Sequence, residues 1–245
     1  MKTLIHTELL KLRTVRSPWL VLAAAPLLVI VGISGLVVSS GDVDPTQQGQ
    51  ALAHVGLTSV FTLVFGILAV AGEYRHKTIT DTYLSTPSRS RVITAKLIVS
   101  ACLGALCGVV STIVGLAVAA AWWSDKGASF AWGQSSMWAT IGGAVAWNAA
   151  FAAIGVGVGA LVRSLVGAIA AALAWIALVE GVVGQLVGNL ARWLPFNAGQ
   201  ALGAAARPMM ADDLLPRWGG AVVLAGYTAL FAVLAVTTSM RRDGA

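Results

Sequence analysis

The chain has 245 residues, of which 58% are hydrophobic and only 11% are charged. Soluble domains carry about 25% charged residues, so this composition excludes an ordinary soluble globular protein. A net charge of +6 could indicate a nucleic-acid partner in a soluble protein. Here, however, apolar runs of about 20 residues, the length that crosses a hydrocarbon core, fill nearly the whole sequence. We therefore predict an all-α integral membrane protein, with one transmembrane domain over residues 1–245, surrounded by membrane lipid and without a nucleic-acid partner.

Residues 1–16 form the first predicted element, an amphipathic helix in the cytoplasmic interface. Lys11 and Arg13 belong to its polar side, whereas Glu8 and Leu10 do not fit the pattern. The alternative is a plain basic flank that only sets membrane orientation. The apolar residues that share one side at helical spacing are Leu4, Ile5, Leu9, Leu12 and Val15.

Six membrane spans follow from the apolar runs and the polar or proline-rich breaks between them. With the N-terminus in the cytoplasm, an even number of spans returns the C-terminus there, and twelve of the sixteen Lys and Arg residues lie on that side. This bias predicts an N-in, C-in orientation. The spans are predicted at about 18–40, 51–71, 92–123, 135–162, 165–190 and 219–239. The twelve cytoplasmic cations are Lys2, Lys11, Arg13, Arg16, Arg75, Lys77, Arg89, Arg91, Lys96, Arg163, Arg241 and Arg242, and the four outside are Lys126, Arg192, Arg207 and Arg217.

The stretch GEYRHKTITDTYLSTPSRSRVITAK, residues 72–96, interrupts the apolar pattern with seven charged residues and one histidine. It lies between the second and third spans, on the predicted cytoplasmic side. Residues 78–86 can form a short helix on which Ile79 and Tyr83 share one face, with Leu84 nearby. Pro87 would end this helix. Charged residues stand at its base: Glu73, Arg75, Lys77, Arg89 and Arg91.

Two interpretations of this loop remain open. In the first, its basic residues serve only to hold the topology and bind anionic headgroups. Alternatively, the short amphipathic helix is a docking surface for a cytoplasmic partner, because apolar residues rimmed by charge suit such a contact. Long loops in compact domains tend to be functional, which favours the second interpretation.

Catalytic chemistry finds no support in the chain. The phosphate-binding pattern G-x-x-x-x-G-K-[ST] does not occur, since no Gly-Lys pair is present. The three histidines, His6, His54 and His76, are scattered over different regions, so we expect neither a metal site nor a catalytic site. We predict that the protein is not an enzyme and binds no cofactor itself.

Three polar residues in the later spans are candidates for lining a substrate pathway: Glu180, Gln185 and Asn148. Ionisable and amide groups within membrane spans often mark such pathways. The alternative for each is a hydrogen-bonding residue packed between helices, or, for Glu180, a carboxylate near the outer interface.

Several segments resemble the permease subunits of bacterial ABC-2-type transporters along the full length of the chain. The clearest resemblance is the stretch 72–96, which is similar to the family pattern Gly-Glu-aromatic, then Thr, then Leu before Thr-Pro, then Arg and a final Lys. Weaker similarity lies in ELLKLRTVRSPW (8–19), GVGVGALVRSLVGAIAAAL (155–173) and LPFNAGQAL (194–202). The matching residues of the main stretch are Gly72, Glu73, Tyr74, Thr78, Leu84, Thr86, Pro87, Arg89, Arg91 and Lys96.

The resemblance implies an ATP-driven exporter in the bacterial plasma membrane. Two permeases, identical or different, would form the substrate pathway, and separate cytoplasmic ATPase subunits would bind ATP and Mg. The loop 72–91 would hold the coupling helix, residues 1–16 the interfacial helix with Glu8, Lys11 and Arg13, and residues 191–217 an external segment of short re-entrant helices. The residues expected to couple to the ATPase are Glu73, Tyr74, Arg75, Thr78, Tyr83, Leu84, Pro87, Arg89 and Arg91.

Two other classes of function remain as alternatives. One is a membrane module that transports nothing, such as an immunity or sensor-anchoring protein. The other is a stand-alone secondary carrier or an intramembrane enzyme, which would depend on an ionisable group such as Glu180.

Overall fold

The computed structural model describes the chain except for residues 41–44, 87, 131, 134, 204–213 and 242–245. Within the described part, every regular element is helical and no strand occurs. The elements are α1 (Lys2–Thr14), α2 (Ser17–Ser40), α3 (Pro45–Leu57), α4 (Ser59–Arg75), α5 (Ile79–Ser85), α6 (Arg89–Asp125), α7 (Ser135–Val162), α8 (Leu165–Ala174), the π-helix η1 (Trp175–Glu180), α9 (Gly181–Leu186), α10 (Gly188–Ala191), α11 (Pro195–Gly203) and α12 (Arg217–Arg241). The expectation of an all-α protein is confirmed.

Among the described residues, five helices are long and apolar enough to cross a membrane. They are Ser17–Ser40, Gln47–Arg75, Arg89–Asp125, Ser135–Val162 and Arg217–Thr238. These correspond to the first, second, third, fourth and sixth predicted spans. The predicted fifth span, 165–190, instead forms α8, η1, α9 and α10, and its apolar helix Leu165–Glu180 is shorter. The count of six spans therefore stays a prediction.

The second span is longer than predicted and is divided into α3 and α4 at Thr58. The single O–H of Thr58 is shared between two acceptors, the carbonyl of Val55 at 2.6 Å and Oδ1 of Asn148 in α7 at 3.0 Å. Threonine side chains that bond the preceding turn compete with the backbone and bend helices. The apolar pattern of residues 51–71 carries no such break, so the sequence predicts one continuous helix here.

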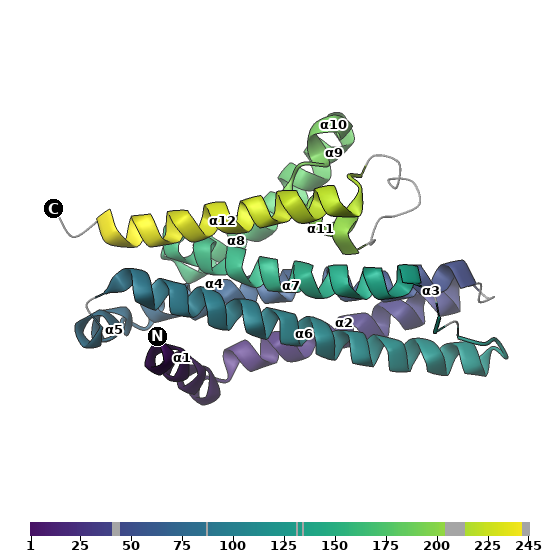
Figure 1. Cartoon of the computed structure of the whole chain (residues 1–245), viewed down its shortest axis with the longest axis horizontal. Coiled ribbons are helices and arrows are strands. Elements are labelled where there is room, and N and C mark those ends of the chain that lie inside the picture. The colour runs from purple at the N-terminus through teal and green to yellow at the C-terminus, as the bar shows by residue number, and fades with distance from the viewer. Residues whose placement is uncertain (41–44, 87, 131, 134, 204–213, 242–245) are drawn as a thin grey trace.

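The long helices run side by side, and α7 is the central one, packed against α4, α6 and α12 (Figure 1). Helix association in a bilayer depends on close packing rather than on the hydrophobic effect, because lipid tails are as apolar as the side chains. Gly66 of α4 and Gly155 of α7 provide this closeness. A Cβ added to Gly66 would overlap the carbonyl of Ala152, and one added to Gly155 would overlap the carbonyl of Leu63.

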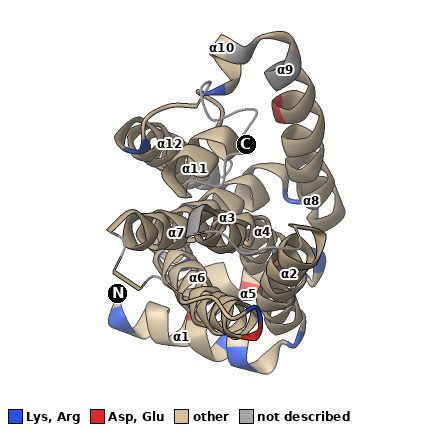
Figure 2. Ribbon diagram, turned by 90° about the vertical axis from the view of Figure 1, so that its right-hand side faces the viewer, with Lys and Arg blue, Asp and Glu red and all other residues tan. Residues whose placement is uncertain are grey.

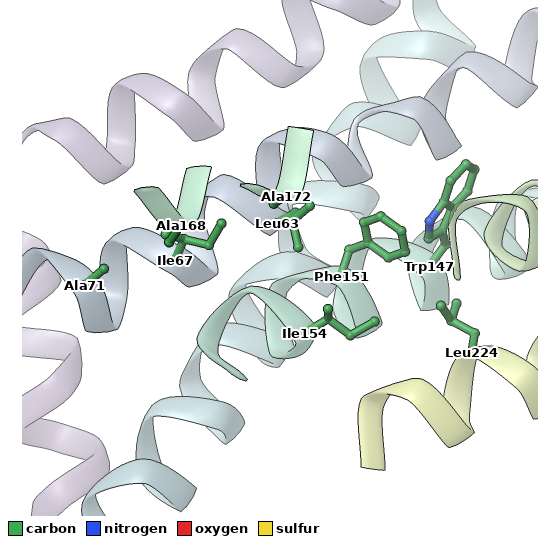
Figure 3. Packing of buried hydrophobic residues seen from close by; sticks show 9 residues of the cluster. All are labelled: Leu63, Ile67, Ala71, Trp147, Phe151, Ile154, Ala168, Ala172 and Leu224. Atoms are coloured by element: carbon green, nitrogen blue, oxygen red, sulfur yellow. The ribbon is translucent and has the colours of Figure 1, made fainter. Parts of the chain in front are cut away.

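Large side chains fill the space between α7 and its neighbours (Figure 3). Trp147 and Phe151 are buried on α7, with ring centroids 5.8 Å apart in an edge-to-face arrangement. The Trp147 ring also lies 5.2 Å from that of Phe196, at the start of α11. Leu224 of α12 belongs to the same cluster. The aromatic contacts therefore connect α11 and α12 to the centre of the bundle.

The ends of the bundle differ in what they carry. Helix α1, the short helix α5 and the C-terminal end of α12 lie at one end, and α3 lies at the other (Figure 1). The limb formed by α8, η1 and α9 stands beside the long helices, leaning on α4 and α7 through α8 (Figure 2). The end that holds α1 and α5 positions the site described next.

Candidate coupling site

Helix α5 sits in the connection between two long helices. Helix α4 ends at Arg75, and Lys77 then adopts the left-handed conformation with φ 58°, which reverses the chain. The backbone N–H of Thr78 donates to the carbonyl of Glu73 at 3.0 Å. Helix α5 follows over Ile79–Ser85, and α6 begins at Arg89. The predicted short helix within residues 78–86 is confirmed.

A charged cluster, formed by Glu8, Lys11, Glu73 and Lys96, lies at the base of α5. Lys96 of α6 is only 2% exposed. Its ammonium donates to Glu8 Oε2 and Glu73 Oε1, each at 2.7 Å, and to the carbonyl of Ala69 at 3.0 Å. An ammonium has three N–H donors, so the donors of Lys96 are fully used.

Lys11 of α1 makes the second set of contacts in the charged cluster. Its ammonium donates to Glu8 Oε1 and Glu73 Oε1 at 2.9 Å, and to the hydroxyl of Thr82 in α5 at 3.1 Å. Partial burial acts to lower the pKa of Lys11, but hydrogen bonds and charge attraction from Glu8 and Glu73 outweigh it, so the pKa lies above its ordinary value. Lys11 therefore stays charged at neutral pH and joins α1 to α4 and α5.

Each carboxylate of the charged cluster contacts both ammonium groups, so two positive and two negative charges alternate. Removing one partner from a buried ion pair leaves an uncompensated charge and costs about 3–5 kcal/mol. The second oxygen of Glu73, Oε2, is buried and meets no hydrogen-bond donor in the described part of the chain. The arrangement depends on all four residues together and connects α1, α4, α5 and α6.

The structure gives the residues of the interfacial helix different roles. The helix over residues 1–16 is present as α1, and Glu8 and Leu12 are its buried residues. Glu8 departs from the apolar stripe because it faces Lys96. Arg13 is exposed and takes no part in the charged cluster. Trp19 at the start of α2 holds the end of α1 by donating from Nε1 to the carbonyl of Leu12 at 2.7 Å.

The other residues expected to couple to an ATPase surround α5. The guanidinium carbon of Arg89 lies 4.4 Å from the ring centroid of Tyr83. The guanidinium carbon of Arg163 lies 5.4 Å from the ring centroid of Tyr74. Leu84 is 77% exposed. Arg75, Thr78 and Arg91 are exposed as well, and Pro87 lies outside the described residues. The structure thus separates Glu73, which is turned into the charged cluster, from the exposed Leu84; their role in coupling stays a prediction.

A scan against protein-family models matches the chain over residues 4–184 to a family described as ABC-2 family transporter protein. The chain belongs to the ABC-2 transporter family. No curated protein matches it. The matched region runs from α1 into α9 and contains every residue of the charged cluster.

Membership of the ABC-2 family establishes the general class of the protein. Its several long apolar helices and its family make it a multi-pass membrane protein and a component of membrane transport. Members of this family work with ABC ATPase subunits in general and are not generally catalytic themselves.

The polar residues considered for a pathway are engaged in hydrogen bonds within this ABC-2 chain. The amide of Asn148 is fully buried and donates to the carbonyls of Val55 and Ala144. Glu180 is 3% exposed and accepts from the backbone N–H groups of Phe196, at 2.8 Å, and Asn197, at 3.0 Å. These contacts correspond to the alternative of packed hydrogen-bonding residues. The side chain of Gln185 lies outside the described residues, and pathway lining stays a prediction.

Glu180 connects two segments that the sequence predicts as separate elements, the span 165–190 and the external segment 191–217. Its carboxylate accepts from the first free backbone N–H groups of α11, where the helix dipole favours a negative charge. Helix α11 is thereby held against the limb formed by α8, η1 and α9. The sequence carries no signal for this contact, because Glu180 and Phe196 are brought together only by the turn through α10.

Lys96 has a structural role that the sequence did not predict. By composition it is one of the cations predicted for the cytoplasmic side, and the structure shows in addition that it is buried in the charged cluster. Two signals could have indicated this. Lys96 lies four residues inside the predicted third span, and Glu8 breaks the apolar stripe of α1. A buried cation requires a carboxylate partner, and Glu8 is the carboxylate that does not fit the apolar pattern of residues 1–16.

Proposed function

We propose that this chain is the membrane-spanning permease subunit of an ATP-driven exporter in the bacterial plasma membrane. Two such subunits, identical or related, form the substrate pathway between them. Separate cytoplasmic ATPase subunits bind ATP and Mg and supply the energy. Family membership supports this proposal, and so does the lack of a phosphate-binding motif in a chain whose α5 end carries most of the charge.

The topology we propose has the α5 end in the cytoplasm. The start of α1, helix α5 and the C-terminal end of α12 lie together at this end (Figure 1). The basic residues predicted for the cytoplasm come largely from these segments, which supports an N-in, C-in orientation. In this proposal the limb of α8, η1 and α9 forms most of the fifth of six spans, α12 is the sixth, and α11 belongs to a re-entrant segment at the outer face.

The observation that carries the proposal is the connection of α5 to three other helices through the charged cluster. Lys11 contacts Thr82 of α5 as well as both carboxylates, and Lys96 connects the same carboxylates to α6. A partner that moves α5 therefore moves α1, α4 and α6 with it. Helices α4 and α6 both pack on α7, so the movement reaches the centre of the bundle. This is a rigid-body transmission between a docking site and a membrane domain.

Leu84 offers the sharpest test of docking, because it is exposed on α5 and makes no part of the charged cluster. We would purify the tagged chain together with an ABC ATPase encoded beside it, and compare Leu84→Ser with Arg16→Ser. Arg16 is exposed at the same end, in the connection between α1 and α2. Leu84→Ser should release most of the ATPase, because a buried apolar contact is lost, and Arg16→Ser should not.

Two results would contradict the proposal. One is that the wild-type chain binds no ATPase. The other is that both variants retain the ATPase as the wild type does, which would place the docking surface elsewhere. Correct folding of both variants is checked by size-exclusion chromatography in detergent.

A further inference from the structure

A cavity of about 710 Å³ lies beside the charged cluster, between α1, α2, α4, α6 and the start of α8. Its volume is within the range of about 300–1,000 Å³ that is typical of small-molecule sites. The proposed coupling mechanism does not use this space. The lining combines an apolar part, which includes Leu12, Leu68, Val99 and Leu165, with the charged cluster, Arg75 and His76.

The charges around the cavity do not cancel. Glu8, Lys11, Glu73 and Lys96 balance one another, and the ammonium donors of both lysines are used by the two carboxylates, the Thr82 hydroxyl and the carbonyl of Ala69. Arg75 remains as an additional exposed cation, and it forms no ion pair or hydrogen bond among the described residues. The lining therefore carries one net positive charge with its guanidinium donors available.

Arg75 suits an oxyanion because guanidinium groups bind phosphate through two parallel N–H donors. Glu73 belongs to the same lining, and its buried Oε2, which has no hydrogen-bond donor among the described residues, disfavours a ligand with several negative charges. An occupant with a single phosphate charge meets both conditions. The apolar side of the cavity requires that this occupant also carries hydrocarbon.

We propose that the cavity binds an anionic phospholipid with one net negative charge, with its phosphate at Arg75 and an acyl chain against Leu12, Leu68 and Val99. The site rests on the proposed function only in placing the α5 end at a membrane–water interface. Basic pockets between transmembrane helices at that level bind anionic headgroups. Membrane lipid is also present at high concentration wherever such a cavity opens. Because the lipid touches α1, α4 and α6 at once, its binding stabilises their arrangement around the charged cluster.

The test is native mass spectrometry of the full chain in detergent, titrated with phosphatidylglycerol or phosphatidylcholine. We expect phosphatidylglycerol to bind at least fivefold more tightly. Arg75→Gln should weaken its binding about fivefold, the effect expected of one basic residue at an anionic headgroup. Arg13→Gln is the matched control. Arg13 is an exposed arginine on α1 that lines a different, smaller cavity, and its loss should leave binding unchanged.

A second variant tests the hydrocarbon part of the site. Ala69→Phe should fill the apolar side of the cavity and lower phosphatidylglycerol binding while all charges remain. Soluble glycerol 1-phosphate, added in tenfold excess over lipid, should not displace the bound lipid. Displacement would overturn the proposal in favour of a site for a free phosphate compound.

Two other outcomes would overturn the proposal. Equal binding of phosphatidylcholine would identify ordinary surrounding lipid, and equal loss in Arg75→Gln and Arg13→Gln would identify a general effect of charge. The lipid titration contains no ATPase, so its result does not depend on ATPase binding. If the chain binds phosphatidylglycerol but purifies without any ATPase, the proposed function is refuted and this inference stands.

Discussion

The charged cluster and the centre of the bundle hold helices together by opposite means. At the centre, Gly66 and Gly155 have no side chains, so the backbones of α4 and α7 come into direct contact. At the α5 end, the same α4 is held to α1 and α6 by ions that have been brought out of water. The van der Waals attraction between closely packed helices falls steeply as the helices separate, whereas the attraction between ion pairs falls slowly with distance. The two regions thus show that one helix, α4, is held by close backbone packing at its middle and by ion pairs at its end, and the function we propose assigns movement as a connected unit to the α5 end.

The largest expected effect is that of breaking the charged cluster. Lys96→Met keeps a long side chain but leaves Glu8 and Glu73 with Lys11 alone. We expect a loss of about 3–5 kcal/mol in the free energy of unfolding, because two carboxylates share one remaining cation. Unfolding by denaturant in detergent measures the loss. Arg91→Met, an exposed position near the start of the same helix, should change stability little.

Neutralising Glu8 tests whether the cost of losing Lys96 comes from its carboxylate partners. In a chain that carries Glu8→Gln, the further change Lys96→Met should cost less than it does in the wild type, because one stranded carboxylate is absent. Equal costs in the two backgrounds would mean that Glu8 and Lys96 do not act together, and the charged cluster would then not connect α1 to α6.

The next effect concerns the centre of the bundle. Gly66→Ala places a methyl group against the carbonyl of Ala152, so α4 and α7 must separate. Overpacking of this kind costs about 1–3 kcal/mol. Gly35→Ala is the matched control, because no atom lies within 4 Å of an added Cβ there. Thermal unfolding should show a lower midpoint for the first variant alone. A midpoint that does not fall for Gly66→Ala would refute the close contact.

The smallest effect is expected where the end of α1 meets the start of α2. Trp19→Phe removes the hydrogen bond from the indole to the carbonyl of Leu12, which contributes about 0.5–1.5 kcal/mol. Hydrogen exchange in α1 should become faster while exchange in α7 stays as it is. Trp138→Phe removes a longer bond, of 3.3 Å, to the carbonyl of Trp132, and should leave α1 unchanged. Faster exchange in both helices would show that α1 is not a separately held element.

The regions also differ in how far the sequence predicts them. The long apolar helices are predictable because a bilayer demands apolar residues along the whole length of a span. Helix α5 is predictable because the polar stretch 78–86 has helical spacing and stops before Pro87. These features are local in the sequence, and the positions at which they begin and end differ from the structure by only a few residues.

The charged cluster and the break at Thr58 lie beyond local patterns. Glu8 and Lys96 are 88 residues apart, and composition alone makes Lys96 one more cation of the positive side. Thr58 interrupts a smooth apolar run because its hydroxyl meets Asn148 of α7, a contact that exists only in the folded chain. Glu180, at the end of η1, is a third case, because its carboxylate accepts from the backbone at the start of α11. In each of them a polar group finds its partner through tertiary packing, which no periodicity records.

Cysteine labelling at Leu84 is the measurement that tests most directly whether an ATPase acts on the membrane domain through α5. Leu84→Cys would be placed in a chain with Cys102→Ala and Cys107→Ala, so that it carries the sole thiol. A membrane-impermeant maleimide should leave intact cells unlabelled, label the position after permeabilisation, and fail to label it when the partner ATPase is bound. Labelling in intact cells, or equal labelling with and without the ATPase, would contradict the account.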